Sequence, residues 1–435
     1  MKFMAAQYAP APLAPASLAD GAVGTMAGGR APGAESGRKI EHGTAQFVLA
    51  NVALFAAGLA TFALLYCVQP LLPLFSQDFH ISATQASLSL SLTTGLLAVS
   101  LLVAGPISEA WGRKPMMATS LLLSAVLALA SAQLHSWGTF LAARALMGVA
   151  MSGLPAVAMA YVGEEMHPRT LGLAMGLYVG GSGLGGMSGR LLVGVMTDFW
   201  GWRTALTVMG LVGIACGAIF WRCLPDSRNF VRSPLSFKTL SRTYATHLRD
   251  GVLPWLFAEG LIVTGGFVTI YNYIGYRLVA PPFSLNQTEI GLIFVVYLFG
   301  IANSAFMGSL STRFGRHRLL PFTFGLMLLG ILLTCGGSLR MIVAGIAVLT
   351  VGFFGAHSMV SAWVGARAKV GKAQASSLYL FAYYMGSSVM GSLGGLFWTW
   401  GGWPGVAAMT GLLVAAGIAV AGMLGRLPAL QPEKA

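Results

Sequence analysis

Long apolar stretches recur along nearly the whole chain, and their length is the strongest constraint on its fold. Twelve runs of about 20 or more mostly apolar residues are separated by polar segments. A helix of about 20 residues rises about 30 Å, the thickness of the hydrocarbon core of a bilayer. We therefore expect an all-α membrane protein with twelve transmembrane helices. The expected spans are 47–75, 82–105, 116–135, 137–162, 170–198, 202–224, 253–279, 288–311, 318–338, 340–364, 374–399 and 402–425.

A glycine-bounded basic turn occurs twice, each time between two apolar runs. The first copy is Gly105-Pro-Ile-Ser-Glu109-Ala-Trp-Gly112-Arg113-Lys114; the second, 203 residues later, is Gly308-Ser-Leu-Ser-Thr312-Arg313-Phe-Gly315-Arg316-His317-Arg318. Such repetition implies a duplicated six-helix unit, and duplicated units are typical of alternating-access carriers. The expected organisation is a disordered cytoplasmic tail (1–44), a six-helix bundle (45–224), a cytoplasmic linker (225–252), a second bundle (253–425) and a tail (426–435).

The net charge of +13 is compatible with nucleic-acid binding, so the positions of the basic residues decide. Of 26 Lys and Arg residues, all but five fall in the tails and in the loops on one side of the predicted membrane. Arg203, Arg277 and Arg340 lie on the other side, and Arg144 and Arg190 lie inside spans. The positive-inside rule then places both termini in the cytoplasm. No basic stretch alternates with aromatic residues as a strand-binding groove requires, so we expect a lipid bilayer as partner and no nucleic acid.

The repeated turns are candidate conformational latches. Glycines allow the sharp backbone turn, and the cations hold the loop at the cytoplasmic surface. Glu109 can pair with these cations or with a neighbouring helix N-terminus, in a contact that forms in one conformation and breaks in another. The alternative is a solvated topological anchor. The latch candidates are Gly105, Glu109, Gly112, Arg113 and Lys114 in the first copy and Gly308, Arg313, Gly315 and Arg316 in the second, which has Thr312 in place of the acid.

These turns resemble the loop motif of the major facilitator superfamily, with Glu109 for its aspartate and Ala110 for its first arginine. Arg144-Ala-Leu-Met-Gly148 is similar to the Arg-x-x-x-Gly element of that superfamily's fourth helix. Gly181-Ser-Gly-Leu-Gly185-Gly186 is similar to the Gly-Pro-x-x-Gly-Gly element of antiporters, with Ser182 at the proline position. Leu224-Pro-Asp-Ser-Arg228 is similar to the Leu-Pro-Glu-Ser ending of the sixth helix. The combination resembles the twelve-helix drug:proton antiporter and arabinose-efflux-like branch of bacterial inner membranes.

Small residues are concentrated in the fifth and eleventh spans. Small residues let helix backbones approach closely in lipid. We expect these two spans to line the interface between the bundles, or to be static packing surfaces. The candidates are Gly181, Gly185, Gly186, Gly391 and Gly395.

Two arginines lie inside predicted spans, where ionisable residues are costly and usually face a cavity or the bundle interior. Tyr178, Ser182, Gly186 and Arg190 recur every four residues and so form one polar helix face. Arg190 is the candidate for holding an anionic or polar substrate group, and Arg144 for orienting it or relaying charge, as the resemblance implies. Either arginine can instead bridge to a backbone carbonyl or to Asp198.

Glu259 is the one carboxylate well inside a predicted span. Burial disfavours the charged form of a carboxyl group, which suits a residue that binds and releases protons. We therefore expect Glu259 to couple transport to protons. The alternative is a helix-end acid paired with a linker arginine.

Several polar residues in other spans can supply hydrogen bonds to a ligand that is largely apolar. Together with the polar face of the fifth span, the candidate substrate-binding residues are Arg190, Arg144, Tyr178, Ser182, Tyr66, Gln69, Asn272, Asn303 and Tyr384.

The function expected from these features is secondary active transport of a small organic solute, such as a sugar, drug-like compound or organic acid. The resemblance implies proton-coupled export. We expect a monomer that is not an enzyme, with no catalytic residue, cofactor or metal, since the sequence has no His-Glu-x-x-His, Gly-x-x-x-x-Gly-Lys-Ser/Thr or paired metal-ligand spacing. Proton-coupled uptake is the alternative. Two other classes remain: a membrane sensor that does not transport, and an intramembrane serine protease using Ser182 in Gly180-Gly-Ser-Gly183 with His357 as base.

Overall fold

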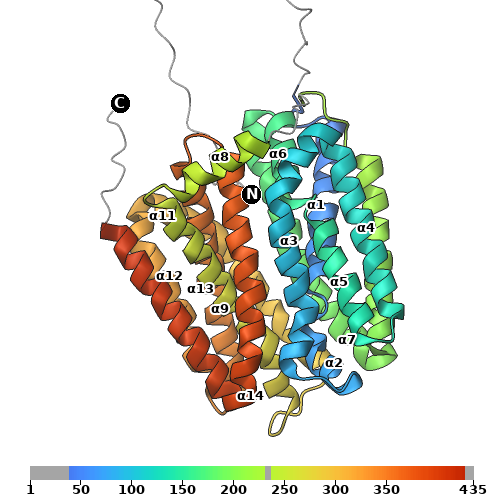
Figure 1. Ribbon diagram of the computed structural model, residues 1–435, viewed down its shortest axis with the longest axis vertical. Coiled ribbons are helices and arrows are strands. Elements are labelled where there is room, and N and C mark those ends of the chain that lie inside the picture. Colours follow the sequence, from blue (N-terminus) through green and yellow to red (C-terminus); the bar gives the residue numbers. More distant parts are fainter. Residues whose placement is uncertain (1–38, 231–236, 427–435) are drawn as a thin grey trace, which may run out of the picture.

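The computed structural model describes residues 39–230 and 237–426, and these ranges are helical, with no β-strand and a single bridge between Ile40 and Met166. The two halves of the chain lie side by side, with α8 across one end (Figure 1). The first half contains α1 (Ala45–Tyr66), η2 (Gln69–Leu71), α2 (Leu72–Asp78), α3 (Ala83–Trp111), α4 (Arg113–Gln133), α5 (Trp137–Met151), α6 (Pro155–Glu165) and α7 (Pro168–Cys223). After α8 (Phe237–Leu248), the second half contains α9 (Leu253–Val279), α10 (Gln287–Ile293), η3 (Phe294–Val296), α11 (Tyr297–Phe314), α12 (Arg316–Thr334), α13 (Leu339–Arg367) and α14 (Lys372–Arg426).

Ten helical stretches in the described ranges are long and apolar enough to cross a membrane. Two of them, α7 and α14, are 56 and 55 residues long, about twice the length of one span. Each breaks at a glycine with positive φ, Gly201 (φ 78°) in α7 and Gly402 (φ 57°) in α14. With α7 and α14 counted as two spans each, the arrangement agrees with the twelve expected from the sequence.

Prolines divide some of the expected spans. The span expected at 47–75 consists of α1, η2 and α2, since Pro70 and Pro73 lack the N–H groups that would continue the ladder of α1. The span expected at 137–162 is divided into α5 and α6 at Pro155. Capping residues begin other helices: Ser82 and Gln85 form a capping box at α3, and Asn286 and Glu289 form one at α10.

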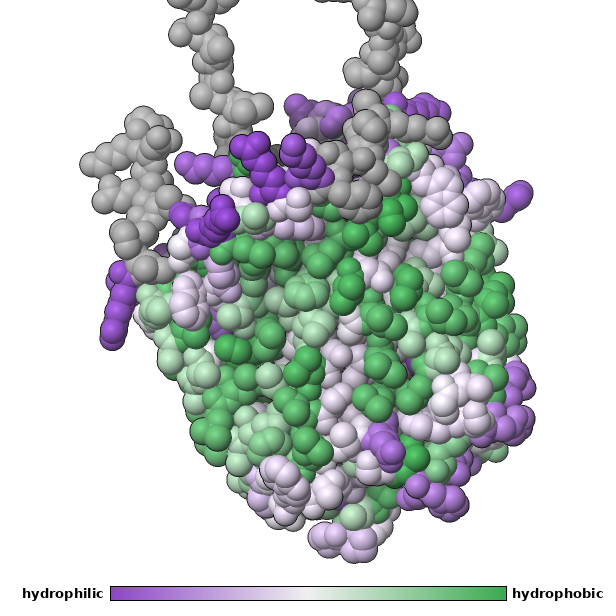
Figure 2. Space-filling model, viewed as in Figure 1, coloured by the Kyte–Doolittle hydropathy of each residue, from purple (hydrophilic) through white to green (hydrophobic). Residues whose placement is uncertain are grey.

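Apolar and polar residues occupy different parts of the surface. Hydrophobic side chains cover the sides of the molecule, and hydrophilic ones gather at its two ends, mainly at the end that carries α8 (Figure 2). We call that end, with the turns at Gly112 and Gly315, the linker end, and the opposite one the far end. Large aromatic side chains are exposed near both: Trp111 and Trp221 towards the linker end, Trp200 and Trp400 at the far end. Tryptophan at these levels is typical of the membrane–water interface.

The expected boundaries need two refinements. The segment expected to be a plain linker contains α8, whose Tyr244 hydroxyl donates to the Leu102 carbonyl of α3 at 2.7 Å. In the expected tail, Ile40 is buried and its N–H donates to the Glu165 carbonyl at 2.8 Å, so ordered contacts begin before α1. The remainder of both expected tails, 1–38 and 427–435, and residues 231–236 of the linker lie outside the described residues.

Two candidate glycines of α7, Gly181 and Gly185, pack inside the first half, which corrects the expectation that they lie between the bundles. A Cβ on Gly181 would lie 2.6 Å from the Phe55 carbonyl oxygen, and one on Gly185 would collide with the Leu59 carbonyl, both in α1. Gly186 instead faces the Arg190 guanidinium. In α14, Gly395 faces Thr84 of α3 and so lies between the halves, and Gly391 faces both Asn272 of α9 and Ser91 of α3. The glycines of α7 therefore bring α1 against α7 more than they join the halves.

Candidate functional site

A cavity of about 290 Å³ lies between the two halves. Helices α1, α7, α9, α11, α13 and α14 all contribute to its lining, and η3 adds a ring near Arg190. From Arg190 the lining continues towards the linker end, as far as Met159, Val364 and Ser376. The cavity therefore extends from the middle of the molecule towards the linker end.

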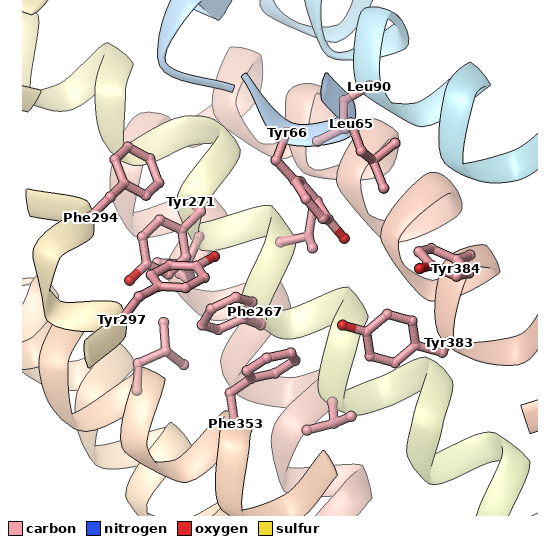
Figure 3. Packing of buried hydrophobic residues seen from close by; sticks show 14 of the residues in the cluster. Leu65, Tyr66, Leu90, Phe267, Tyr271, Phe294, Tyr297, Phe353, Tyr383 and Tyr384 are labelled. Atoms are coloured by element: carbon pink, nitrogen blue, oxygen red, sulfur yellow. The ribbon is translucent and has the colours of Figure 1, made fainter. Parts of the chain in front are cut away.

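Aromatic rings form a large part of the walls. Phe267 and Phe353 stack with centroids 3.7 Å apart. Figure 3 shows the hydroxyl groups of Tyr66 in α1 and of Tyr383 and Tyr384 in α14 pointing into the space between these two helices. The arrangement offers a ligand broad apolar contact and a few hydrogen-bonding groups.

Arg190 closes the inner end of the cavity. Its side chain is buried, its Nε donates to Gln69 Oε1 at 2.6 Å, and its Nη1 donates to the Gly186 carbonyl. Its Cζ lies 4.3, 4.9 and 5.1 Å from the ring centroids of Tyr66, Tyr297 and Phe294. Within the described residues, no carboxylate pairs with Arg190, and its Nη2 makes no hydrogen bond. One terminal nitrogen of a buried cation is thus left for a ligand.

A chain of hydrogen bonds connects Arg190 to the second half. Gln69 accepts from Arg190, and its Nε2 donates to Asn272 Oδ1 of α9 at 2.7 Å. Neither Gln69 nor Asn272 lines the cavity, and both are buried. These two predicted binding residues therefore lie behind Arg190 and between the halves.

Arg144 has different surroundings. It is buried outside the cavity, and it donates to the carbonyls of Leu64 (3.2 Å), Leu65 (2.9 Å) and Ser89 (2.9 Å). Leu64 and Leu65 lie in the last turn of α1, where carbonyls have no intrahelical partner. Arg144 therefore caps α1 where the helix breaks, just before Gln69. The structure corrects the expectation of a substrate contact and matches the alternative of a bridge to backbone carbonyls.

Of the other polar candidates, some line the cavity and one does not. Tyr66, Tyr178, Ser182 and Tyr384 line the cavity. Asn303 does not line it, because its Nδ2 donates to the Val351 carbonyl at 2.9 Å.

Glu259 lies in α9, completely buried and outside the cavity lining. Neither carboxylate oxygen has a hydrogen-bond partner in the described ranges. The alternative of an ion pair with a linker arginine is therefore not what this conformation contains. Burying an ionised carboxylate without a partner is costly.

Ser182 and His357 both line the cavity but do not bond to each other. The Ser182 hydroxyl donates to the Tyr178 carbonyl at 3.0 Å, and His357 Nδ1 lies 2.8 Å from the Tyr379 hydroxyl. A serine nucleophile requires a base within hydrogen-bonding reach. In the part of the chain that the structure describes, no group of three or more His, Cys, Asp or Glu side chains is placed to hold a metal ion.

The first repeated turn is anchored by acids other than the expected one. Gly112 has a φ of 114°, as the turn requires, and Gly105 lies in the preceding helix. Arg113 pairs with Glu164 at 2.6 Å, and Lys114 pairs with Asp226 at 2.9 Å. Within the described residues, Glu109 makes no ion pair. The expected pairing of Glu109 with these cations is thus absent from this conformation, because α6 and the end of α7 bring other acids closer.

The second repeated turn also bends at a glycine with positive φ, but in the described ranges it lacks the ion pairs of the first turn. Gly315 has a φ of 83°, and Gly308 lies inside α11. Arg313 and Arg316 have no acidic partner among the described residues. The two copies are therefore alike in shape and different in charge pairing.

At the far end, hydrogen bonds join the two halves to each other. Asp198, at the end of a span in α7, accepts from the backbone N–H groups of Gln287 (3.2 Å) and Thr288 (2.7 Å) at the start of α10. The Tyr276 hydroxyl lies 2.7 Å from the Ser76 hydroxyl and donates to the Leu72 carbonyl at 2.9 Å. These contacts lie beyond Arg190, on the side away from the cavity.

Sequence reasoning included Tyr66 but missed Phe294 beside Arg190, and it missed the role of Asp198 as a cap. Phe294 begins a short 3-10 interruption of an apolar run, Tyr297 follows it, and no residue pattern marks this interruption. The sequence suggests Asp198 only as a partner for an arginine. The capping box Asn286–Glu289 does mark a helix start, but nothing in the sequence relates it to Asp198.

Comparisons with known proteins agree with this architecture. The sequence profile of the Major Facilitator Superfamily matches residues 54–278 and 262–435. The inner membrane transport protein YnfM of Escherichia coli (strain K12) is 49% identical over 387 residues, covering 89% of this chain and 93% of YnfM. The MFS-type transporter YybF of Bacillus subtilis (strain 168) is 46% identical, covering 89% of this chain and 96% of YybF. Among solved structures, a mutant of the nucleoside transporter NupG has a TM-score of 0.73 at 13% identity, covering 86% of this chain and 99% of NupG.

The chain belongs to the major facilitator superfamily, a family of multi-pass membrane transporters. The likeness to NupG concerns the fold alone.

Proposed function

We propose that the protein is a secondary active transporter that moves a small organic solute across the bacterial inner membrane by alternating access. The observation that carries the proposal is the position of the cavity, which extends from Arg190 towards the linker end. At the opposite, far end, hydrogen bonds join the two halves to each other. A site between two six-helix halves, accessible from one side at a time, is what rocking of the halves requires.

The orientation follows from charge. Most Lys and Arg residues lie at the linker end or in the tails, so we place the linker end and both termini in the cytoplasm. In this orientation the described conformation has its cavity towards the cytoplasm. We propose export, in line with the antiporter-like glycine element, and keep uptake as the alternative. We propose that the protein acts as a monomer without a cofactor and is not an enzyme.

Glu259 is our candidate for proton coupling. It is a buried carboxyl group with no partner, so it changes its charge only when a conformational change brings it water or a cation. The repeated turns, Gly105 to Lys114 and Gly308 to Arg316, are proposed to regulate the linker end, with the pairs Arg113–Glu164 and Lys114–Asp226 as contacts to break or remake.

Flux in proteoliposomes tests the proposal. A panel of labelled sugars, drugs and organic acids is offered with and without an imposed pH gradient. We expect the gradient to drive at least one solute in wild type, and Glu259→Gln to lose that dependence while retaining exchange down the solute's own gradient. Glu289→Gln is the matched control, because Glu289 is exposed and glutamine also completes a capping box.

Two results count against the proposal. Lack of flux for every solute with an intact, folded protein favours the sensor alternative. Gradient-driven flux that survives Glu259→Gln removes this residue as the coupling site. The protease alternative already lacks a serine–histidine hydrogen bond in this conformation.

A further inference from the structure

Resting on the proposed transport function, we propose that the cavity binds an organic anion with an apolar body, whose acid group pairs with Arg190. The charge of the lining is the first reason. Within the described residues that line the cavity, Arg190 is the one permanently charged side chain, and no Asp or Glu is present. A cationic ligand would meet an unbalanced positive charge in this cavity.

The second reason is the incomplete coordination of Arg190. A guanidinium has five N–H donors and binds carboxylates through two parallel hydrogen bonds. Here one bond goes to a neutral amide, one to a backbone carbonyl of its own helix, and Nη2 has none. The faces of Tyr66, Tyr297 and Phe294 stabilise the cation but cannot replace a counter-ion. A buried charge without an ionic partner is favourable only if a partner arrives.

The remaining lining defines the body of the ligand. Phe267, Phe353 and Ile301 contribute apolar surface, and the Tyr178 hydroxyl is buried at the cavity wall without a hydrogen-bond partner. A cavity of about 290 Å³ with these walls suits an aromatic or alicyclic ring bearing one acid group and at most a few polar substituents.

Gln69 connects the anion site at Arg190 to Asn272 of the second half. The ligand's acid group reaches Arg190 Nε only by displacing Gln69 Oε1, and the same amide donates to Asn272 across the halves. An acid group that binds both Nη2 and Nε of Arg190 therefore changes a bond that joins α9 to the first half. Gln69 is in this sense a positioning residue, which acts through Arg190 and Asn272.

The test uses matched ligands and matched variants of the purified full-length protein in detergent. The ligands are benzoate and 2-naphthoate, their amides, and benzylamine, with affinities measured by titration calorimetry at pH 7. In wild type we expect at least one acid to bind tenfold or more tightly than its amide, and benzylamine not to bind. Gln69→Glu places a permanent carboxylate beside Arg190 and is expected to abolish the preference for the acid. Glu289→Gln, at an exposed acid outside the cavity lining, is the control and is expected to keep that preference.

Arg190→Gln supplies a second variant, should Gln69→Glu not fold, and it must also lose the preference. The proposal is overturned if no acid binds more tightly than its amide, or if the preference survives a folded Gln69→Glu or Arg190→Gln variant. Flux of the same compounds separates this inference from the proposed function. Transport of an amide but not of its acid keeps transport and rejects the anion site; Arg190-dependent binding of the acid without any flux keeps the site and rejects transport.

Discussion

Arg144 and Arg190 are both buried arginines of the first half, yet their surroundings differ in one decisive respect. Arg144 donates to three backbone carbonyls and lies outside the cavity, whereas Arg190 makes two hydrogen bonds and faces the cavity with a free nitrogen. The same side chain thus completes the backbone at one site and awaits a ligand at the other. The two sites are also connected, because Arg144 caps the break in α1 that sets Tyr66 and Gln69 beside Arg190.

The largest expected effect is the loss of ligand binding in Arg190→Met. Removing one partner of a buried, hydrogen-bonded charge pair costs about 4 kcal/mol, or roughly a thousandfold in affinity. The empty protein should not lose stability, because an unbalanced buried charge is removed with it. Calorimetric titration with 2-naphthoate and thermal unfolding in detergent measure the two quantities. If the melting temperature of Arg190→Met falls as far as that of Arg144→Met, then Arg190 supports the fold as Arg144 does, and the distinction between a ligand-binding and a structural arginine is wrong.

Arg144→Met is expected to have its main effect on stability. It leaves the carbonyls of Leu64, Leu65 and Ser89 without this donor, and we expect a loss of about 2 to 3 kcal/mol. Thermal unfolding in detergent checks this, with Arg340→Met as the control at an exposed arginine near the far end. If both variants unfold at the same temperature, Arg144 does not hold α1 in place.

A smaller effect is expected from the ring of Tyr66, whose centroid lies 4.3 Å from Arg190 Cζ. A double-mutant cycle of Tyr66→Leu with Arg190→Met should give a coupling of about 1 kcal/mol in unfolding free energy, the size of a cation–π contact. The same cycle with Tyr66→Phe should give a coupling smaller than half of this, since phenylalanine retains a ring face. Equal coupling for the two substitutions would assign the effect to the hydroxyl group, which both remove.

The smallest effect concerns a third arginine, Arg367, which does have an acidic partner. Asp250 accepts from Arg367 at 2.9 Å at the linker end, where both side chains are partly exposed. Burial by itself raises the pKa of Asp250, but hydrogen bonds from Arg367 and from the backbone N–H groups of Leu253 and Val252 outweigh it and hold that pKa below its ordinary value.

This depressed pKa determines the sign of the pH dependence. The pair contributes stability above the pKa of an unfolded aspartate, about 3.9, and the contribution is lost as pH falls through the lower pKa of the folded state. We expect Asp250→Asn to cost less than about 1 kcal/mol at pH 7, because the pair is partly solvated. The melting temperatures of the variant and of wild type should approach each other as pH falls below about 3.9, and a difference that does not shrink in acid would contradict the role of charge.

Much of the architecture could be predicted from the sequence. Apolar length predicted the spans, the repeated turn predicted two halves, and the spacing of Tyr178, Ser182 and Arg190 predicted a single helix face, which the structure places in the cavity. These inferences depend on local geometry, namely the rise of a helix and its period of 3.6 residues. The extra helix α8 and the break in α1 were harder to predict, because each depends on a few residues within a longer pattern.

The sequence by itself determined that two arginines would be buried in the first half, and it determined nothing about which one would meet a ligand. That was decided by the tertiary structure, through contacts between segments far apart in the chain. Close packing of α1 against Gly181 and Gly185 of α7 places Tyr66 and Gln69 beside Arg190, and the broken end of α1 gives Arg144 its carbonyl partners. The physical reason is that insertion of a span depends on its own composition, whereas the partner of a buried charge depends on which helices pack beside it.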